Sequence, residues 1–280
     1  MRNHRITVDG AELAVRDHGE GPPLVLLHGW PHTSALWDLM RPALERSFRV
    51  ITPDLRGMGD STRVTGPIAG ATVAADLIAV LDALDIDSAT VVAIDASVPG
   101  AFLAGMQHPD RVDRLVLAES LLMPLPGADA FLAGGPPWWF GFHGVPGLAE
   151  HAVAGNEDAY IGWFLRNGTR TREGVPAEMA AQFVDALRGP ESLASSFGYY
   201  HSGAETAAAV AAATSTGRLT VPTLAVGGDT VGDVLANQLS GVTDTLTRRL
   251  FPSAGHILPV DVPDEFAALI TDFCAGQLAG

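Results

Sequence analysis

The stretch Thr90-Val91-Val92-Ala93-Ile94-Asp95-Ala96-Ser97-Val98-Pro99-Gly100 decides the fold that this sequence predicts. A β-branched apolar run, typical of a buried strand, ends at one carboxylate, and a helical pattern begins at Val98. This order predicts a sharp strand–helix turn whose apex side chain stands over the carboxyl end of a parallel sheet. Strand and helix nearly touch at such a turn, so the positions two residues either side of the apex must be small.

Two residues compete for the apex of this turn. The flanking positions of Asp95 are Ala93 and Ser97, which are both small. Serine is the more usual apex residue, but the flanks of Ser97 would be Asp95 and Pro99, which fit poorly. The apolar run would also end two residues too early. The sequence therefore favours Asp95, with a plain helix N-cap as the alternative interpretation of this residue.

Length and charge narrow the class of protein. The 280 residues fit one large domain or a domain with an insertion, and the formal net charge of −15 argues against nucleic acid or anionic membranes as partners. The single Cys274 cannot form an internal disulfide, the first residues lack a signal-peptide pattern, and no run could span a bilayer. We therefore expect a cytoplasmic protein acting on a small molecule. A homodimer is compatible with the sequence, which does not determine the oligomeric state.

Strand and helix patterns alternate along most of the chain. Residues 6–16 alternate around Asp9-Gly10, which indicates a hairpin. Apolar strand patterns cover residues 24–27, 48–51, 90–94, 114–118, 221–226 and 246–251, and helical patterns cover 34–45, 72–84, 98–106 and 264–275. This alternation predicts an α/β fold with a mostly parallel sheet.

The alternation stops between residues 124 and 218, where helical patterns follow one another without a strand. The natural interpretation is a helical insertion that lies over the carboxyl edge of the sheet, where ligand sites of α/β proteins form. We therefore expect an α/β core formed by residues 1–123 and 219–280, and a helical cap formed by residues 124–218, above Asp95.

A carboxylate nucleophile needs a base to act on the ester that it forms, and a third group to orient that base. His256 lies on the loop after the last predicted strand, which makes it the candidate base. Two acids compete to orient it. Asp229 has the more common location, after the strand that ends at Val226, but the usual Gly-x-x-acid spacing from Gly227 falls on Thr230, one residue later. Glu119, at the end of the strand after the elbow strand, is the acid that we favour.

Further candidates surround these three side chains. The backbone N–H groups of Trp30 and Ala96 can point at one spot and hold a developing oxyanion. Tyr199 and Tyr200 of the predicted cap supply phenols, which can donate to a leaving alkoxide, although aromatic packing is an equally simple interpretation of the pair. The remaining predicted pocket residues are Pro31, Trp138, Trp139 and His143. No motif for a nucleotide cofactor and no metal-ligand spacing occurs, so we expect neither a cofactor nor a metal.

Taken together, these segments resemble the α/β-hydrolase superfamily, in particular its epoxide hydrolase and haloacid dehalogenase branch with an Asp nucleophile. His28-Gly29-Trp30-Pro31 is similar to the His-Gly-x-Pro signature of epoxide hydrolases. The loop 54–61 is similar to one found throughout the superfamily, and Gly255-His256 to its terminal histidine motif. The resemblance covers almost the whole chain and implies an eight-stranded, mostly parallel sheet with a helical cap.

Within this branch, the placement of Glu119 and the run 197–201 resemble a bacterial subgroup that includes fluoroacetate dehalogenases and certain secreted epoxide hydrolases. The resemblance implies that Tyr200 is the phenol used in ring opening, with Trp139 or His143 as a possible second donor. The elbow departs from the usual Gly-x-Asp-x-Gly, in which Trp or Arg follows the Asp. Here Ala96 follows it, and the arginines that hold a substrate carboxylate in fluoroacetate dehalogenases are missing.

The sequence therefore predicts an epoxide hydrolase that opens a small, mostly apolar epoxide without a cofactor. In the expected mechanism Asp95 forms an ester with the substrate and His256 activates the water that hydrolyses it. The alternatives are a haloalkane or haloacid dehalogenase of the same fold, and a non-catalytic or specialised natural-product protein that uses this fold for another purpose.

Overall fold

The computed structural model describes residues 2–278 and contains one sheet with the strand order β1-β2-β4-β3-β5-β6-β7-β8. The strands are β1 (Arg2–Val8), β2 (Ala11–His18), β3 (Pro23–Leu27), β4 (Arg49–Pro53), β5 (Ala89–Ile94), β6 (Val112–Ala118), β7 (Thr223–Gly227) and β8 (Leu246–Leu250). β2 pairs antiparallel with β1 and β4, and the other neighbouring strands are parallel. The predicted eight-stranded, mostly parallel sheet is therefore confirmed.

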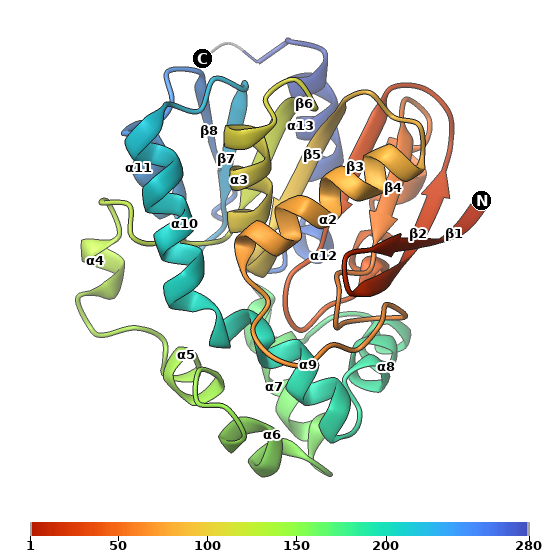
Figure 1. Ribbon diagram of the computed structural model, residues 1–280, viewed down its shortest axis with the longest axis vertical. Helices are drawn as coiled ribbons and strands as arrows, with labels where there is room; N and C mark the ends of the chain where they lie inside the picture. Colours follow the sequence, from red (N-terminus) through yellow and green to blue (C-terminus); the bar gives the residue numbers. More distant parts are fainter. Residues whose placement is uncertain (1, 279–280) are drawn as a thin grey trace.

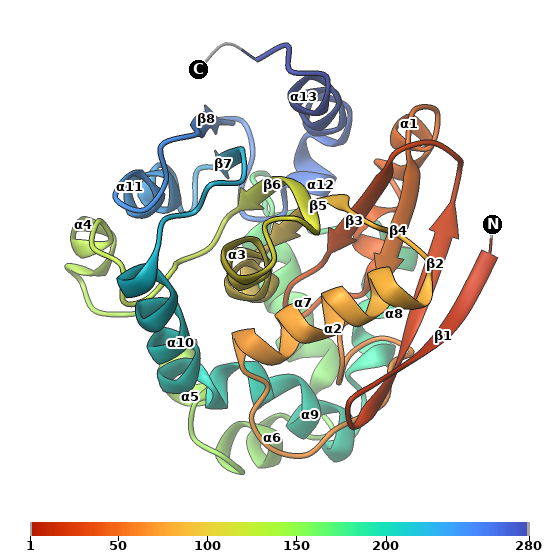
Figure 2. The same cartoon turned by 45° about the horizontal axis from the view of Figure 1, so that its top comes forward.

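Helices that alternate with these strands cover both faces of the sheet. They are α1 (Arg41–Leu44), α2 (Gly70–Ala83), α3 (Val98–Gln107), α11 (Val234–Ser240), α12 (Leu258–Asp261) and α13 (Pro263–Cys274). Figures 1 and 2 show α2 and α3 together on one face and α13 on the other. Every residue of β5 is buried, as expected for a strand of a parallel sheet that is covered on both sides.

The segment after β3 differs from the single helix expected over residues 34–45. The structure has a 3₁₀ turn, η1 (Ser34–Trp37), followed by the single turn of α1. Pro42 explains the interruption, because it has no N–H to donate to the carbonyl of Asp38 and its ring would crowd that carbonyl in a continuous helix. The break directs Leu36 and Trp37 into the core, where both are fully buried.

Between β6 and β7 the chain forms helices only, which we call the inter-strand helices. They are α4 (Asp129–Leu132), α5 (Trp138–His143), α6 (Leu148–Val153), α7 (Glu157–Gly168), α8 (Ala177–Ala186), α9 (Pro190–His201) and α10 (Gly203–Thr216). Figure 1 shows α5 to α9 gathered beyond one end of the sheet, while α10 returns along its side toward α3. Within residues 2–278, no helix combines the length and apolar character needed to cross a membrane.

Candidate active site

Asp95 stands at the corner where β5 turns into η2 (Asp95–Ser97) and then α3. Its φ angle is +57°, in the left-handed region that a residue with a side chain rarely adopts. Gly29 makes this corner possible, because a Cβ at that position would clash with the Asp95 side chain. Strained backbone of this kind is concentrated at functional sites, and here it directs a carboxylate toward the carboxyl ends of the strands.

Ser97, the competing apex residue, lies inside the fold. Its side chain is fully buried, and its hydroxyl donates to the carbonyl of Leu27 at 3.0 Å or that of Ile94 at 2.9 Å. The backbone N–H of Ile94 also donates to this hydroxyl, at 3.2 Å. Ser97 therefore ties β5 to β3, and the structure has Asp95 at the apex.

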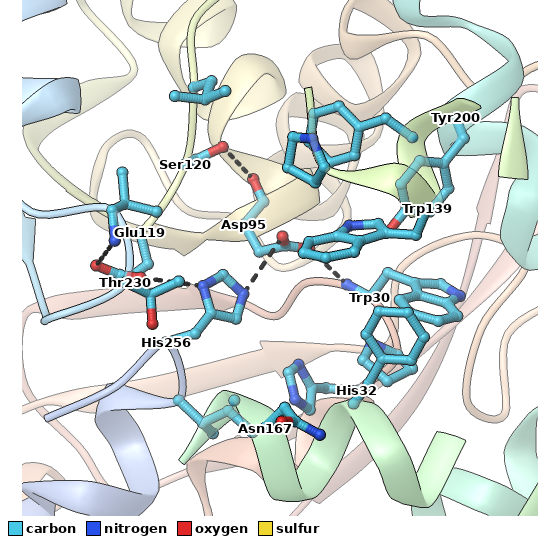
Figure 3. A pocket seen from close by; sticks show the side chains of 18 of the residues that line it. Trp30, His32, Asp95, Glu119, Ser120, Trp139, Asn167, Tyr200, Thr230 and His256 are labelled. Atoms are coloured by element: carbon cyan, nitrogen blue, oxygen red, sulfur yellow. Dashed lines mark hydrogen bonds and ion pairs between the residues drawn. The ribbon is translucent and has the colours of Figure 1, made fainter. Parts of the chain in front are cut away.

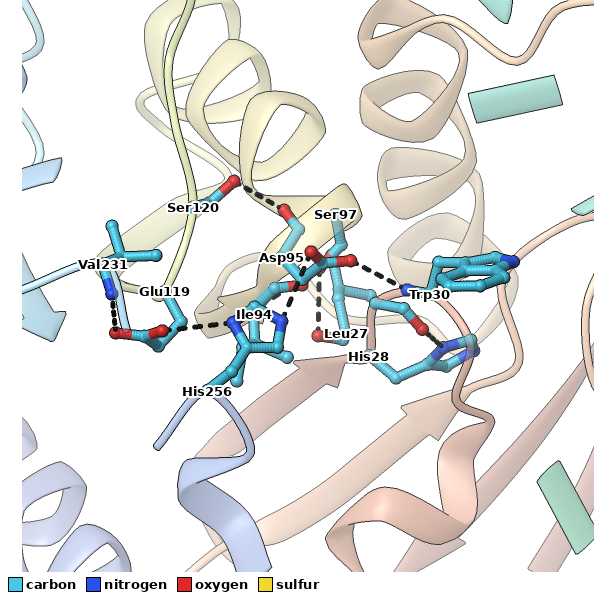
Figure 4. A network of polar contacts seen from close by, with 11 residues as sticks. Leu27, His28, Trp30, Ile94, Asp95, Ser97, Glu119, Ser120, Val231 and His256 are labelled. Atoms are coloured by element: carbon cyan, nitrogen blue, oxygen red, sulfur yellow. Dashed lines mark hydrogen bonds and ion pairs between the residues drawn. The ribbon is translucent and has the colours of Figure 1, made fainter. Parts of the chain in front are cut away.

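His256 lies between two carboxylates (Figure 4). Its Nε2 is 3.4 Å from Oδ2 of Asp95, and its Nδ1 is 3.1 Å from Oε2 of Glu119. Burial lowers the pKa of His256, but the two carboxylates outweigh burial and raise this pKa to about 10. Burial also raises the pKa of Asp95, but the contacts with His256 and with two backbone amides leave it below its usual value. At neutral pH the site therefore contains an imidazolium between two carboxylates.

The structure brings Glu119, and not Asp229, to His256. Glu119 is buried, and its Oε1 accepts from the backbone N–H of Gly228 at 2.6 Å, which leaves Oε2 for the histidine. The side chain of Asp229 is 58% exposed and pairs with Arg170 at 3.3 Å. In the described part of the chain, no ion pair within 4.0 Å joins Asp229 to His256. The Gly-rich turn after β7 thus supplies backbone N–H donors to Glu119, and it does not supply the acid that orients His256.

Two backbone amides hold the carboxylate of Asp95. The N–H of Trp30 donates to Oδ1 at 2.9 Å, and the hydrogen bond from the N–H of Ala96 also lowers the pKa of this carboxyl. His28 connects the loop that contains Trp30 to the loop 54–61, because its Nε2 accepts from the backbone N–H of Leu55 at 3.0 Å. The ring of His28 is buried, and burial lowers its pKa, so it is a neutral structural residue.

A cavity of about 170 Å³ adjoins Asp95, between the strand ends and the inter-strand helices (Figure 3). Its walls are mainly apolar, with aromatic side chains from Trp30, Phe131, Trp139, Phe140, Trp163, Phe164 and Tyr200. Asp95, Glu119 and His256 also line it. Tyr200 is partly buried, and desolvation, together with the nearby Asp95 charge, raises the pKa of its phenol well above the usual value, so it stays protonated. The cavity therefore combines an ionised carboxylate with a neutral hydroxyl donor.

The expected pocket residues divide into two groups. Pro31 and Trp139 line the cavity, together with Tyr200. Trp138 does not, because it is 54% exposed and borders a separate depression beside Trp163. Neighbouring residues of a helix point about 100° apart, so only one of the two tryptophans at the start of α5 can face inward.

His143 and Tyr199 also lie outside this cavity, contrary to expectation. His143 is completely buried behind Trp30 and Tyr200, and its Nε2 is 2.6 Å from the hydroxyl of Tyr160. Because its side chain is enclosed by these neighbours, His143 is not available as a second donor to a ligand. The hydroxyl of Tyr199 donates to the carbonyl of Arg56 at 2.9 Å and lines a neighbouring cavity.

His32 and Asn167 are polar cavity residues that the sequence analysis did not identify. His32 borders it with a ring that is 2% exposed, and within residues 2–278 neither ring nitrogen has a hydrogen-bond partner. Burial, helped by the His256 charge, lowers its pKa to about 3, so this imidazole is neutral. Its place directly after Pro31 was a usable signal. Asn167 comes from α7 and had no such signal, because only tertiary packing brings that helix to the site (Figure 3).

Known proteins share this arrangement of the chain. Residues 22–261 match a family model described as alpha/beta hydrolase fold. The soluble epoxide hydrolase of Corynebacterium sp. (strain C12) is 28% identical over 278 residues, which cover 94% of this chain and 93% of that protein. The solved structure of the epoxide hydrolase CorEH without ligand superposes with a TM-score of 0.88, at 26% identity and 99% coverage of both chains. That of Cfl2 from Burkholderia cenocepacia also gives 0.88, at 29% identity, covering 97% of this chain and 95% of the other.

Proposed function

This chain belongs to the alpha/beta hydrolase fold family and is a hydrolase of epoxide hydrolase-like character, and from that premise we propose that it opens apolar epoxides to diols through an ester on Asp95. The observation that carries the proposal is the unequal environment of the two Asp95 oxygens. Oδ1 accepts from the Trp30 amide, whereas Oδ2 faces His256 at the edge of the aromatic cavity. In this proposal residues 124–218 form a cap over a core of residues 1–123 and 219–280.

The first step is ring opening. Oδ2 of Asp95 forms a bond to an epoxide carbon, and the bond between that carbon and the ring oxygen breaks. The alkoxide takes the proton of the Tyr200 hydroxyl, whose raised pKa keeps it protonated at neutral pH. Oδ1 stays with the amides of Trp30 and Ala96 and becomes the carbonyl oxygen of the ester.

Ester formation removes the charge that contributes most to the raised pKa of His256. The imidazolium therefore becomes a stronger acid and returns a proton to the Tyr200 phenolate through solvent. His256 is then neutral, with Glu119 fixing the proton on Nδ1, so its Nε2 is free to act as a base. The same histidine is thus a resting cation before ring opening and a general base after it.

The second step is hydrolysis of the ester. Water attacks the carbonyl carbon of Asp95, its proton passes to Nε2 of His256, and the negative charge develops on Oδ1 between the two amides. Collapse of this intermediate releases the diol, whose new hydroxyl contains the former Oδ2 and takes the proton back from His256. Asp95 is left as a carboxylic acid with one oxygen from water, and its proton passes to His256, which restores the resting ion pair.

The lining of the cavity favours this reaction over release of a halide from a haloacid. The indole N–H of Trp30 donates to Ser196 at 3.3 Å, which turns it away from a ligand and leaves the indoles of Trp139 and Trp163 among the described lining residues. The described lining residues include no arginine that could hold a haloacid carboxylate. Arg170 does not line the cavity and pairs with Asp229 instead.

A panel of matched substrates tests the proposal. An alkyl epoxide, a haloalkane and a haloacid of similar size are incubated with the enzyme, and diol and halide are measured by chromatography. We expect diol from the epoxide and no halide. Halide release with no diol would identify a dehalogenase, and binding without any product would identify a non-catalytic member of the family.

A further inference from the structure

A second cavity, of about 390 Å³, adjoins the one described above. We call the cavity of about 170 Å³ the first chamber and this one the second chamber. Both chambers are lined by Asp95, Ser120, Leu121, Phe140 and Tyr200. The two chambers therefore meet at Asp95 and Tyr200, the residues on which the proposed reaction depends, and the proposed reaction centre borders both chambers.

The second chamber exists because small residues meet there from separate parts of the chain. Gly70 begins α2, Ala96 follows the nucleophile candidate, and Gly203 and Ala207 lie in the first turns of α10. No atom lies within 4 Å of the place where a Cβ on Gly203 would stand. A larger side chain after Asp95, or on this face of α10, would fill the space next to the carboxylate.

The polar side chains of the second chamber are already engaged with the protein. The hydroxyl of Tyr199 donates to the carbonyl of Arg56 at 2.9 Å, and that of Ser202 donates to the carbonyl of Ile68 at 2.7 Å. The hydroxyl of Thr206 accepts from the N–H of Gly70 at 3.0 Å. A ligand group in this chamber therefore finds mainly apolar contacts, from Ile68, Val73 and Met123 among others.

We propose that the physiological substrates are epoxides substituted on both ring carbons, with one substituent in each chamber and the larger apolar substituent in the second. This inference rests on the proposed epoxide hydrolase function. The ring must lie between Asp95 and Tyr200, where the chambers meet, so substituents on its two carbons extend to either side. A terminal epoxide would leave the larger chamber empty and would lose the apolar burial that this chamber offers.

The second chamber also determines how long an alkyl substituent of the substrate can be. Met123, at its edge, is 43% exposed, and Gly203 lies on the surface. An alkyl chain longer than the chamber can therefore extend past these residues into solvent. The first chamber has less than half of this volume, so we expect the smaller substituent on that side.

Two isomers provide the direct test. The terminal epoxide of an octane chain and the symmetrical internal epoxide of the same chain have one formula, and they differ in whether one or both ring carbons carry an alkyl group. We expect kcat/KM for the internal isomer to be at least about tenfold higher. A preference for the terminal isomer would overturn the inference and leave the proposed function standing, whereas no diol from either isomer would overturn both.

A variant closes the second chamber. Ala207→Phe places an aromatic ring inside it from α10, and Ala208→Phe, at the next and exposed position of that helix, is the matched control. We expect A207F to lower kcat/KM for the internal isomer at least about tenfold and for the terminal isomer less than about threefold, with A208F close to the wild type for both. An equal loss for both isomers would overturn the inference, because a product exit or a structural role would affect them alike.

A second variant allows the same comparison to be made if A207F does not fold. Gly203→Leu adds its side chain where the structure has open space for a Cβ. Thermal unfolding followed by circular dichroism identifies which variant keeps the wild-type midpoint, and the substrate comparison is made on that protein. Unchanged selectivity in a folded G203L variant would contradict the inference in the same way.

Discussion

The Nε2 atom of His256 lies 3.4 Å from the Oδ2 atom of Asp95, so the candidate base and the candidate nucleophile form an ion pair in the unliganded protein. Ester formation would break this pair, because an ester carries no charge. The structure therefore links the protonation state of the histidine to the stage of the reaction. Each half of the proposed cycle then has the form of His256 that it needs, without a large movement of the site.

The path of oxygen tests whether Asp95 forms an ester. In a single turnover in heavy-oxygen water, with enzyme in excess, the first diol should carry no label and the enzyme should carry one labelled oxygen in the peptide that contains Asp95. The reason is that the new hydroxyl of the diol comes from Oδ2 and water replaces it on the enzyme. Mass spectrometry of product and peptide gives both results. Label in the first diol would mean that water attacks the epoxide directly.

Asp95→Ala is the companion variant for that experiment. It removes the nucleophile and the negative partner of His256, and we expect no diol. The fold should persist, because the strained corner loses a side chain and gains no new contact. An unchanged thermal midpoint with zero turnover separates loss of chemistry from loss of structure.

The raised pKa of His256 predicts a dependence of stability on pH. Its value is about 10 in the folded protein, against 6.5 for an unperturbed histidine. Between these values the folded state binds more protons than the unfolded state, so the stabilisation is complete below pH 6.5 and is lost as the pH rises toward 10. The slope cannot exceed about 1.4 kcal/mol per pH unit for one proton.

Urea unfolding of the wild type and of His256→Gln across this pH interval measures the effect. We expect the difference in unfolding free energy between the two proteins to shrink steadily with rising pH. Tyrosine ionisation contributes only near the upper end and affects both proteins, so subtraction removes it. A constant difference would mean that His256 is not a resting cation between Asp95 and Glu119.

The neighbouring tyrosines Tyr199 and Tyr200 provide a matched pair for the ring-opening step. Tyr200→Phe removes the phenol that lines both chambers beside Asp95 and should slow ester formation by roughly 10²–10³-fold, as expected for the loss of one donor to a developing oxyanion. Tyr199→Phe removes a hydroxyl bonded to the carbonyl of Arg56 and should cost stability, with little effect on this rate. Stopped-flow tryptophan fluorescence follows the step. Equal rates in the two variants would remove Tyr200 from the mechanism.

The sequence predicted the parts of this site that follow from strand order. Asp95, Glu119 and His256 each follow a strand of one parallel sheet, and the carboxyl ends of parallel strands meet at one edge. The small residues around the elbow also distinguished Asp95 from Ser97, since steric exclusion acts locally and is visible in the residue types. For Asp95, Glu119 and His256, the predicted strands and their directions were therefore enough to identify the side chains as neighbours.

Side chains on the inter-strand helices were less predictable. Trp138 and Trp139 are chemically identical, and only the packing of α5 against α7 determines which of them faces the cavity. His143 is excluded by its burial against Tyr160, a contact between helices that no spacing reveals. The second chamber arises from α2, α10 and the elbow together, so its existence depends on the tertiary arrangement of distant segments.

Glu119 and Asp229 offer the sharpest comparison, because Asp229 has the more common location for the acid, whereas the sequence analysis favoured Glu119 and the structure pairs Glu119 with His256. Glu119→Gln keeps an acceptor for the N–H of Gly228 but can present an NH₂ group to Nδ1 of His256. That change favours the wrong tautomer and removes the charge that stabilises the imidazolium. Hydrolysis of the ester should therefore slow on the order of 10³–10⁴-fold, while its formation slows much less.

The ester on Asp95 should then accumulate in E119Q and be visible by mass spectrometry as the intact protein plus the mass of the epoxide. Asp229→Asn is the matched control, since it removes one charge from an exposed pair with Arg170 and leaves the contacts of His256 in place. It should turn over normally without an adduct. An adduct in D229N and normal turnover in E119Q would assign the acid to Asp229, and would mean that the Gly-rich turn after β7 rearranges when substrate binds. The 2.6 Å hydrogen bond from Gly228 to Glu119 argues against such a rearrangement, because it anchors that turn to the carboxylate that already holds the histidine.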